Sequence, residues 1–294
     1  METLDNCPVC NHKQFSPFLN CVDHLVSIET YSIVSCDNCG LRFTNPRPTS
    51  QRIHQFYRSE KYVSHSNVTK GVVNFLYQKV RKHTIRKKIQ FINSLSPEQR
   101  NILDIGCGTG EFLNACKQSG WNTKGFEPND TARDYAIKHY KLAVINKQEL
   151  LSLPENSFDI ITMWHVLEHV HDLEQRMKEV YRLVKPNGTV IIAVPNCLSL
   201  DAELYKENWA GYDVPRHLYH FTPNTITQLV HNFGMNVVKM LPMKFDSYYV
   251  SMLSEKYKNG SNNYLKAIWN GWQSNNQARK DPAKWSSLIY LITK

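Results

Sequence analysis

From residue 101 onward, short apolar runs alternate with stretches in which apolar residues recur every three or four positions. The runs predict buried β-strands, and the stretches predict amphipathic helices. Strand and helix follow one another repeatedly, which is typical of an α/β fold with a doubly wound, mostly parallel sheet. The predicted strands cover residues 101–105, 123–127, 142–145, 158–163, 189–194, 237–241 and 287–293. The predicted helices cover residues 111–119, 130–139, 173–184, 223–233, 246–257 and 265–272, with Asp130 and Asp172 as N-caps.

Three glycines follow the first predicted strand. The run from Asn101 reads Asn-Ile-Leu-Asp-Ile-Gly-Cys-Gly-Thr-Gly, and a helix is predicted to begin directly after it. Glycine lacks a Cβ atom, so a ligand can lie against the backbone of Gly106, Gly108 and Gly110. A strand, a glycine turn and a helix form the ligand-binding corner of an open α/β sheet. The run lacks the later glycine of the dinucleotide fingerprint, and no Gly-Lys-Ser/Thr phosphate motif follows it.

Two acidic residues accompany the glycine turn. Asp104 precedes the glycines, where it suits a cationic ligand, and Glu127 ends the second predicted strand. An acidic residue at the Glu127 position can accept hydrogen bonds from both hydroxyls of a ribose. A ligand that contains a ribose and a cationic group but no phosphate is consistent with S-adenosylmethionine (SAM). At this point the sequence resembles the class I SAM-dependent methyltransferases. The segments that carry the resemblance are Asp104–Gly110, Phe126–Pro128, Phe158–Ile161 and Trp164–Val170.

The resemblance covers residues 99–294 and is tightest over 102–195. It implies a Rossmann-like sheet of seven strands, with the last strand antiparallel between the fifth and the sixth. It also implies that Asp104 holds the amino group of SAM and that Glu127 binds its ribose. Residues 148–153 are expected as a loop over the adenine ring, with a solvated loop that makes no contact as the alternative. The other cofactor-binding residues expected from the resemblance are Gly106, Gly108, Gly110, Gln148, Glu149, Trp164 and His165.

An insert over about 195–222 follows the fifth predicted strand and is rich in aromatic and histidine side chains. It is expected to be irregular and to enclose the acceptor. Histidine titrates near neutral pH and can deprotonate a hydroxyl or carbon acid. We therefore take His217, His220 and Tyr212 as candidate catalytic residues. The alternative is that these side chains only pack the insert onto the domain.

Four cysteines near the N-terminus form two Cys-x-x-Cys pairs, Cys7 with Cys10 and Cys36 with Cys39. Two such pairs at this separation are typical of a zinc ribbon, in which four thiolates surround one structural Zn²⁺ ion. Asn11 and Gly40, which follow the pairs, both tolerate the left-handed backbone of a tight turn. Reduced structural cysteines or a redox pair are the alternatives. Bacterial methyltransferases with an N-terminal zinc ribbon are similar in this arrangement, and some of them act on sugars and other small metabolites.

Residues 45–98 are interpreted as a linker, with a short helix near residues 53–57, followed by a basic amphipathic helix over about 70–95. They separate a zinc ribbon at 1–44 from a methyltransferase domain at 99–294. Although the net charge of the chain is +9, eight basic residues and no acidic one fall within 61–97. This excess indicates either an RNA-binding surface or a solvated helix face. The basic residues are Lys61, Lys70, Lys79, Arg81, Lys82, Arg86, Lys87 and Lys88.

The sequence favours a SAM-dependent methyltransferase acting on a small-molecule acceptor. An RNA methyltransferase and a non-catalytic SAM-binding protein are the alternatives. His165 and His169 are spaced as metal ligands on a helix, but Glu168 is out of place for the His-Glu-x-x-His order, so we expect no metal there. No apolar run reaches the length of a membrane span and no signal peptide is visible, so we expect a cytoplasmic protein with no membrane partner. The sequence predicts neither the acceptor nor the oligomeric state.

Overall fold

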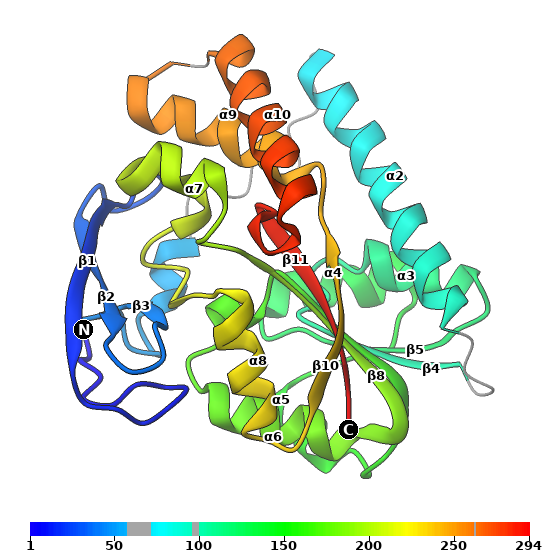
Figure 1. Cartoon of the computed structure of the whole chain (residues 1–294). Helices are drawn as coiled ribbons and strands as arrows, with labels where there is room; N and C mark the ends of the chain where they lie inside the picture. The colour runs from blue at the N-terminus through cyan, green and yellow to red at the C-terminus, as the bar shows by residue number, and fades with distance from the viewer. Residues whose placement is uncertain (58–71, 96–99, 262) are drawn as a thin grey trace.

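A computed structural model describes residues 1–57, 72–95, 100–261 and 263–294 (Figure 1). Within these residues the chain forms a seven-stranded sheet and a four-stranded sheet. Residues 58–71 and 96–98 of the predicted linker and basic helix, including Lys61 and Lys70, lie outside the described residues. In the part that is described, no helix combines the length and the apolar character needed to cross a bilayer.

The larger sheet confirms the predicted doubly wound fold. Its strand order is β10-β11-β8-β7-β4-β5-β6, with β4 to β8 parallel and β11 antiparallel between β8 and β10. The carboxyl ends of the parallel strands therefore meet at one edge, where ligands bind in such sheets. The strands are β4 (Asn101–Ile105), β5 (Asn122–Phe126), β6 (Val144–Ile145), β7 (Phe158–Trp164), β8 (Val184–Pro195), β10 (Asn236–Pro242) and β11 (Ser287–Thr293).

Both faces of this sheet are covered, because the parallel strands are apolar on both sides. On one face Ile102, Ile160 and Ile191 pack in a buried cluster with Ile89 of α2 (Val72–Ser94). On the other face lies a second cluster with Leu103 and Ile161 from the strands. The remaining helices around the sheet are α3 (Glu111–Gln118), α4 (Asp130–Tyr140), α5 (Lys147–Ser152), α6 (Leu173–Leu183) and α8 (Pro223–His231).

Two local predictions about the helices need correction. The N-cap of α4 is Asn129, whose side chain accepts a hydrogen bond from Ala132 N at 2.9 Å, so Asp130 is the first helical residue. Residues 148–153, expected as a loop, lie mostly in α5. Asn146 and Glu149 form a capping box there, in which the side chain of each residue accepts a hydrogen bond from the backbone N–H of the other. The capping residue Asp172 of α6 is confirmed.

The smaller sheet joins the N-terminus to the insert. Its order is β1-β2-β3-β9, and the last strand comes from residues 219–220 of the insert. In this pairing Arg42 lies opposite His220 and Phe43 lies opposite Tyr219. The sequence did not predict it, because a two-residue strand carries no periodic signal. Its strands are β1 (Phe15–Val22), β2 (Thr30–Cys36), β3 (Arg42–Thr44) and β9 (Tyr219–His220), and η1 (Ile53–Tyr57) follows as the expected short helix.

The insert and the C-terminal segment contain more helix than predicted. The insert forms α7 (Leu200–Tyr205) and two 3₁₀ turns, η3 (Lys206–Asn208) and η4 (Ala210–Tyr212). After β10 the chain forms a hairpin of α9 (Asp246–Asn259) and α10 (Tyr264–Lys280), and α10 extends eight residues beyond its predicted end. Figure 1 shows this hairpin above the edge of the sheet, beside α2. Two further 3₁₀ turns are η2 (Leu167–His169) and η5 (Pro282–Lys284).

Candidate active site at the carboxyl edge of the sheet

The glycine turn opens toward the carboxyl edge. Gly108 has a φ of +55°, and a Cβ atom built there would meet nothing within 4 Å. Its N–H donates to Oε2 of Glu127 at 2.8 Å. Gly110 has a different reason to be glycine, since a Cβ atom there would lie 2.7 Å from Leu142 and 2.9 Å from Ala136. The turn is therefore tightly packed at its helix end and open where a ligand would lie.

Glu127 is held rigidly at the end of β5. Its side chain is buried, and its second oxygen accepts a hydrogen bond from Asn129 N at 2.9 Å. Burial raises the pKa of this carboxyl, while the N–H groups of Asn129 and Gly108 favour its charged form. Each carboxylate oxygen has two lone pairs, so both can still accept a hydrogen bond from a ligand hydroxyl.

Asp104 lies buried beneath the turn. Its Oδ1 accepts a hydrogen bond from the Thr162 hydroxyl of β7 at 2.6 Å. Burial raises the pKa of Asp104 to about 7, even though Thr162 and the ammonium group of Lys88 both favour the charged form. A cationic ligand near this carboxyl would therefore promote its ionisation at neutral pH.

A lysine from α2 completes this part of the site. The Nζ atom of Lys88 lies 3.8 Å from the centre of the Trp164 ring, which also packs edge-on against Phe112. Burial lowers the pKa of Lys88 to about 8, against the attraction of Asp104 and Asp246. Sequence reasoning assigned no role to Lys88 beyond the basic face. One sequence feature could have singled it out. Lys88 lies on the same helical face as the buried Ile89 and the neighbouring Ile85 and Ile92, and a lysine there interrupts an apolar stripe.

His165 directly follows Trp164 and connects two carboxylates. Its Nδ1 lies 3.4 Å from Glu168 Oε1, and its Nε2 lies 3.3 Å from Asp246 Oδ2 in the first turn of α9. Burial alone would lower the pKa of His165, but Asp246 and Glu168 outweigh it and raise this pKa to about 9. His165 has a φ of +55°, which is strained for a residue with a Cβ atom. Asp246 was missed, because nothing in the sequence places residue 246 beside residue 165.

The three residues taken as catalytic candidates lie deeper, at the junction between insert and small sheet. Tyr212 and His220 are buried, and their rings meet edge-to-face with centroids 5.1 Å apart. Burial lowers the pKa of His220 well below its usual range, and its Nε2 lies 3.3 Å from the Thr44 hydroxyl. His217 Nδ1 lies 2.8 Å from the carbonyl oxygen of Gly211. This placement suits packing of the junction, and the catalytic roles of the three residues stay predictions.

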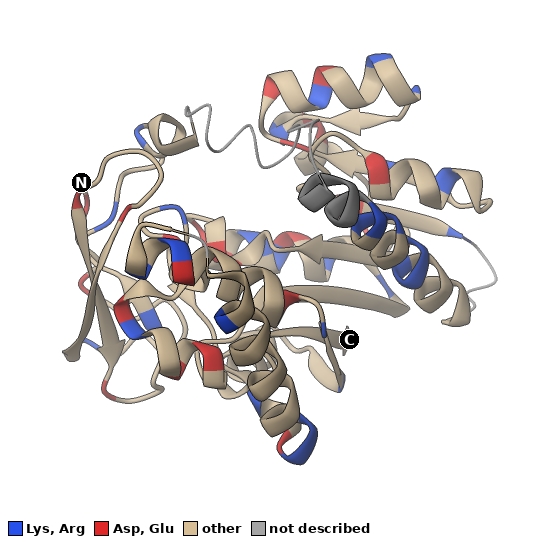
Figure 2. Cartoon of the chain, turned by 90° about the horizontal axis from the view of Figure 1, so that it is seen from above, with Lys and Arg blue, Asp and Glu red and all other residues tan. Residues whose placement is uncertain are grey.

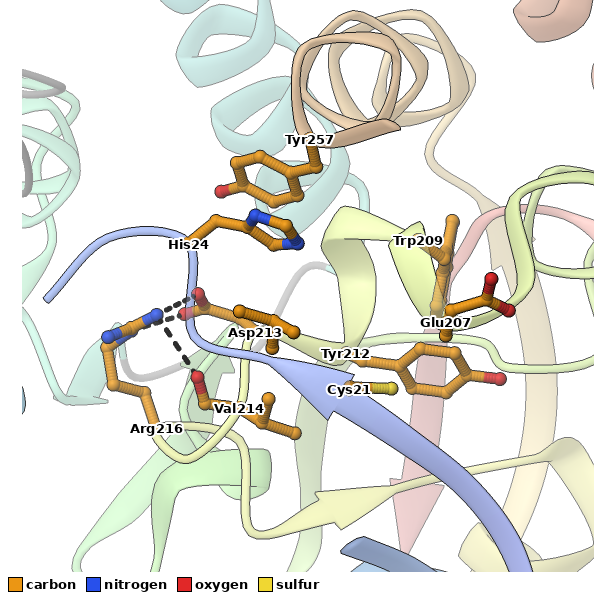
Figure 3. A pocket seen from close by; sticks show the side chains of 10 residues that line it. Cys21, His24, Glu207, Trp209, Tyr212, Asp213, Val214, Arg216 and Tyr257 are labelled. Atoms are coloured by element: carbon orange, nitrogen blue, oxygen red, sulfur yellow. Dashed lines mark hydrogen bonds and ion pairs between the residues drawn. The ribbon is translucent and has the colours of Figure 1, made fainter. Parts of the chain in front are cut away.

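A buried ion network anchors the same junction. The guanidinium of Arg216 donates to Asp213 at 2.7 Å and to Asp23 of the N-terminal segment at 2.9 Å. Figure 3 shows Arg216 and Asp213 beside a small pocket, with His24 stacked on Tyr257 of α9. The pocket has about 10 Å³ of free volume, roughly the space of one water molecule, so it does not fit an acceptor.

Gln148 and Glu149, expected near the adenine ring, are exposed on α5. The carboxylate of Glu149 accepts the backbone N–H of Asn146 at 2.9 Å, which ties it to the start of the helix. Among the described residues no contact bears on adenine binding, and this role also stays a prediction.

The four N-terminal cysteines come together as a cluster. Their sulfur atoms all lie within 4.8 Å of one another, and Cys7–Cys39 and Cys10–Cys36 are each 3.5 Å apart. A tetrahedral Zn²⁺ site with bonds of about 2.3 Å places its sulfurs about 3.8 Å apart, so the cluster fits such an ion. As expected, Asn11 and Gly40 adopt φ values of +60° and +73°.

Comparisons with known proteins agree with this geometry. The family described as "Methyltransferase domain" matches residues 77–240, which is more than half of the 294-residue chain. The chain belongs to this family. The matched region runs from α2 into β10 and contains the glycine turn, Glu127 and His165.

Two curated relatives carry the name ubiquinone biosynthesis O-methyltransferase. The one from Rhodopseudomonas palustris is 27% identical over 160 residues, which are 49% of this chain and 62% of the relative. The one from Coxiella burnetii is 27% identical over 152 residues, which are 47% of this chain and 64% of the relative. The match thus spans less than two thirds of either relative's length.

Solved structures agree on the fold. A SAM-dependent methyltransferase from Archaeoglobus fulgidus superimposes with a TM-score of 0.50 at 20% identity, covering 76% of this chain and all of that one. At this identity the similarity establishes the seven-stranded methyltransferase fold and nothing finer.

Proposed function

We propose that this chain transfers the methyl group of SAM to an oxygen atom of a small-molecule acceptor. The observation that carries the proposal is the Glu127 carboxylate, fixed by the Gly108 N–H in front of the open glycine turn. Family membership supports it, as does the name O-methyltransferase of the two relatives. A sugar or another small metabolite as the acceptor stays a prediction.

The cofactor would lie along the carboxyl ends of β4 and β5. Bound SAM supplies an electrophilic methyl group on a sulfonium. Glu127 would accept hydrogen bonds from the ribose hydroxyls, and Asp104 would attract the cationic amino group directly or through water. The Trp164 ring would border the sulfonium side and keep water away from the transferring methyl group.

His165 is the best-placed group for the acceptor. It lies at the carboxyl edge with about a third of its side chain exposed, and with a pKa of about 9 it carries a proton at neutral pH. Both ring nitrogens already face carboxylates, so an acceptor oxygen would take the place of Asp246 at Nε2 to receive a hydrogen bond from the imidazolium. Such a donor suits an acidic hydroxyl such as a phenol, whose pKa is about 10 in tyrosine, bound as its anion after losing its proton to water. Glu168 would hold the ring in position through Nδ1.

The test is calorimetric titration with S-adenosylhomocysteine. We expect micromolar binding to the wild type and at least tenfold weaker binding to Glu127→Ala, a loss of about 1.4 kcal/mol or more. Glu203→Ala, the same change at an exposed position of α7, is the matched control and should bind as the wild type does. Absence of binding to folded wild-type protein would overturn the proposal.

An RNA acceptor is a second candidate because of the basic face of α2. Figure 2 shows Lys and Arg gathered along this helix. Lys79, Lys82, His83 and Arg86 line a groove of about 430 Å³ together with Phe245. From Lys79 to Arg86 the helix rises only about 10 Å, a short footprint for RNA. Binding of a structured RNA that weakens steeply with salt would favour this candidate.

We also propose that the Cys7, Cys10, Cys36 and Cys39 cluster holds a structural Zn²⁺ ion. All four ligand positions come from the protein, which is typical of structural rather than catalytic zinc. One zinc per chain by elemental analysis is the expected result.

A further inference from the structure

The hairpin of α9 and α10 packs through unusually small and polar side chains. On α9 the buried residues include three serines, and a Cβ atom on Gly271 of α10 would lie 3.0 Å from the backbone of Tyr248. The two helices therefore approach closely without an apolar seam between them. The buried residues are Ser247, Ser251, Ser254 and Glu255 on α9, and Ala267, Asn270, Gly271, Ser274, Asn275 and Ala278 on α10.

The large apolar side chains of α10 point outward instead. Leu265 is 84% exposed, Ile268 54%, Trp269 56% and Trp272 44%. Their spacing places them on one helical face, and the two tryptophan rings stack with centroids 5.1 Å apart. A surface helix of a soluble protein normally turns such a face to the core. In α10 the small and polar residues face the protein and the large apolar residues face solvent. A contiguous exposed apolar face of this kind indicates a binding surface.

The exposed charges on the hairpin are all positive. Within the described residues from 246 to 280 the acids are Asp246, which contacts His165, and Glu255, which is buried against Tyr205 and pairs with Lys266 at 3.6 Å. The exposed basic residues are Lys256, Lys258, Lys266, Arg279 and Lys280. A second copy docked symmetrically through this hairpin would bring two basic surfaces together, which is unfavourable. An anionic surface complements both features.

We propose that the α9–α10 hairpin docks on an anionic phospholipid surface. Leu265, Ile268 and the two tryptophans would enter the boundary between headgroups and acyl chains, and the lysines would contact lipid phosphates. The expectation of no membrane partner rested on the lack of a membrane-spanning run, which a helix lying on the surface does not need. Because Asp246 begins α9 and contacts His165, docking brings the edge of the candidate site to the lipid.

The experiment is co-sedimentation of the full chain with vesicles of phosphatidylcholine alone and of phosphatidylcholine with phosphatidylglycerol. We expect binding to the mixed vesicles, weaker binding in high salt, and a blue shift of tryptophan emission. The double variant Leu265→Gln, Ile268→Gln, which keeps both tryptophans, should bind at least tenfold more weakly. Ile28→Gln, a similar change at a side chain that is 64% exposed in the N-terminal segment, should bind as the wild type does.

Two outcomes would overturn the proposal. One is an absence of vesicle binding, or equal binding by the double variant and the wild type. The other is a wild-type dimer, seen by light scattering, that the double variant dissociates, because the face would then belong to a second copy. Thermal unfolding and titration with S-adenosylhomocysteine show whether the variants remain folded, and they keep this test separate from that of the methyl-transfer activity.

Discussion

The glycine turn and the junction of the small sheet are built in opposite ways. At the turn, Asp104, Gly108 and Glu127 lie within 24 residues, and Gly108 and Glu127 are in direct hydrogen-bond contact. At the junction, the ion pair between Arg216 and Asp23 joins residues 193 apart, and Thr44 meets His220 across 176. The comparison teaches that the hydrogen bond between the glycine turn and Glu127 depends on short-range sequence, whereas the attachment of the N-terminal segment depends on contacts that only folding creates.

The largest expected effect is loss of the cysteine cluster. Cys36→Ser should abolish zinc binding and unfold the small sheet, because structural zinc contributes on the order of 10 kcal/mol to small metal-stabilised folds. Elemental analysis and thermal unfolding measure the two effects. Cys21→Ser, a buried cysteine of the same segment outside the cluster, should keep its zinc. Full zinc content in Cys36→Ser would contradict the assignment.

The next effect concerns the ion network of the junction. Arg216→Ala leaves the buried Asp23 and the partly buried Asp213 without their guanidinium partner, and removing one partner of a buried pair costs about 3–5 kcal/mol of unfolding free energy. Urea denaturation measures this loss. Lys138→Ala breaks a pair with Asp134 in which both side chains are more than half exposed, and should cost less than about 1 kcal/mol. Equal losses in the two variants would show that the junction is no stronger than a surface contact.

The difference between the two regions also explains what the sequence could predict. The succession of strands and helices, the turn at Gly106–Gly110 and the cysteine cluster follow from local patterns, and the place of the last strand in the sheet follows from the family resemblance. The structure confirms all of them. Asp246 beside His165 and the pairing of Tyr219 with Phe43 come from distant segments. Periodicity describes one element at a time, so it did not reveal that Tyr212, His217 and His220 lie in the junction.

The smallest effect tests the turn itself. The folded-state pKa of Asp104 is raised to about 7 from an ordinary value of about 3.9, so its contribution to stability is fully present below about pH 3.9 and is lost as the pH rises toward 7. A bound cation reverses this preference, because it favours the charged carboxylate. We therefore expect affinity for SAM to fall by up to tenfold per pH unit below pH 7, as measured by calorimetry. Asp104→Asn should show weaker binding without this pH dependence.

The pairing of β3 with β9 constrains how this protein can change over evolutionary time. The N-terminal segment does not end its own sheet, since the last strand comes from an insert in the middle of the catalytic fold. A lineage that exchanged one segment without the other would lose a strand partner and the Thr44–His220 contact together. We therefore expect the two segments to be inherited as one unit, and substitutions in β3 and β9 to co-vary among related sequences.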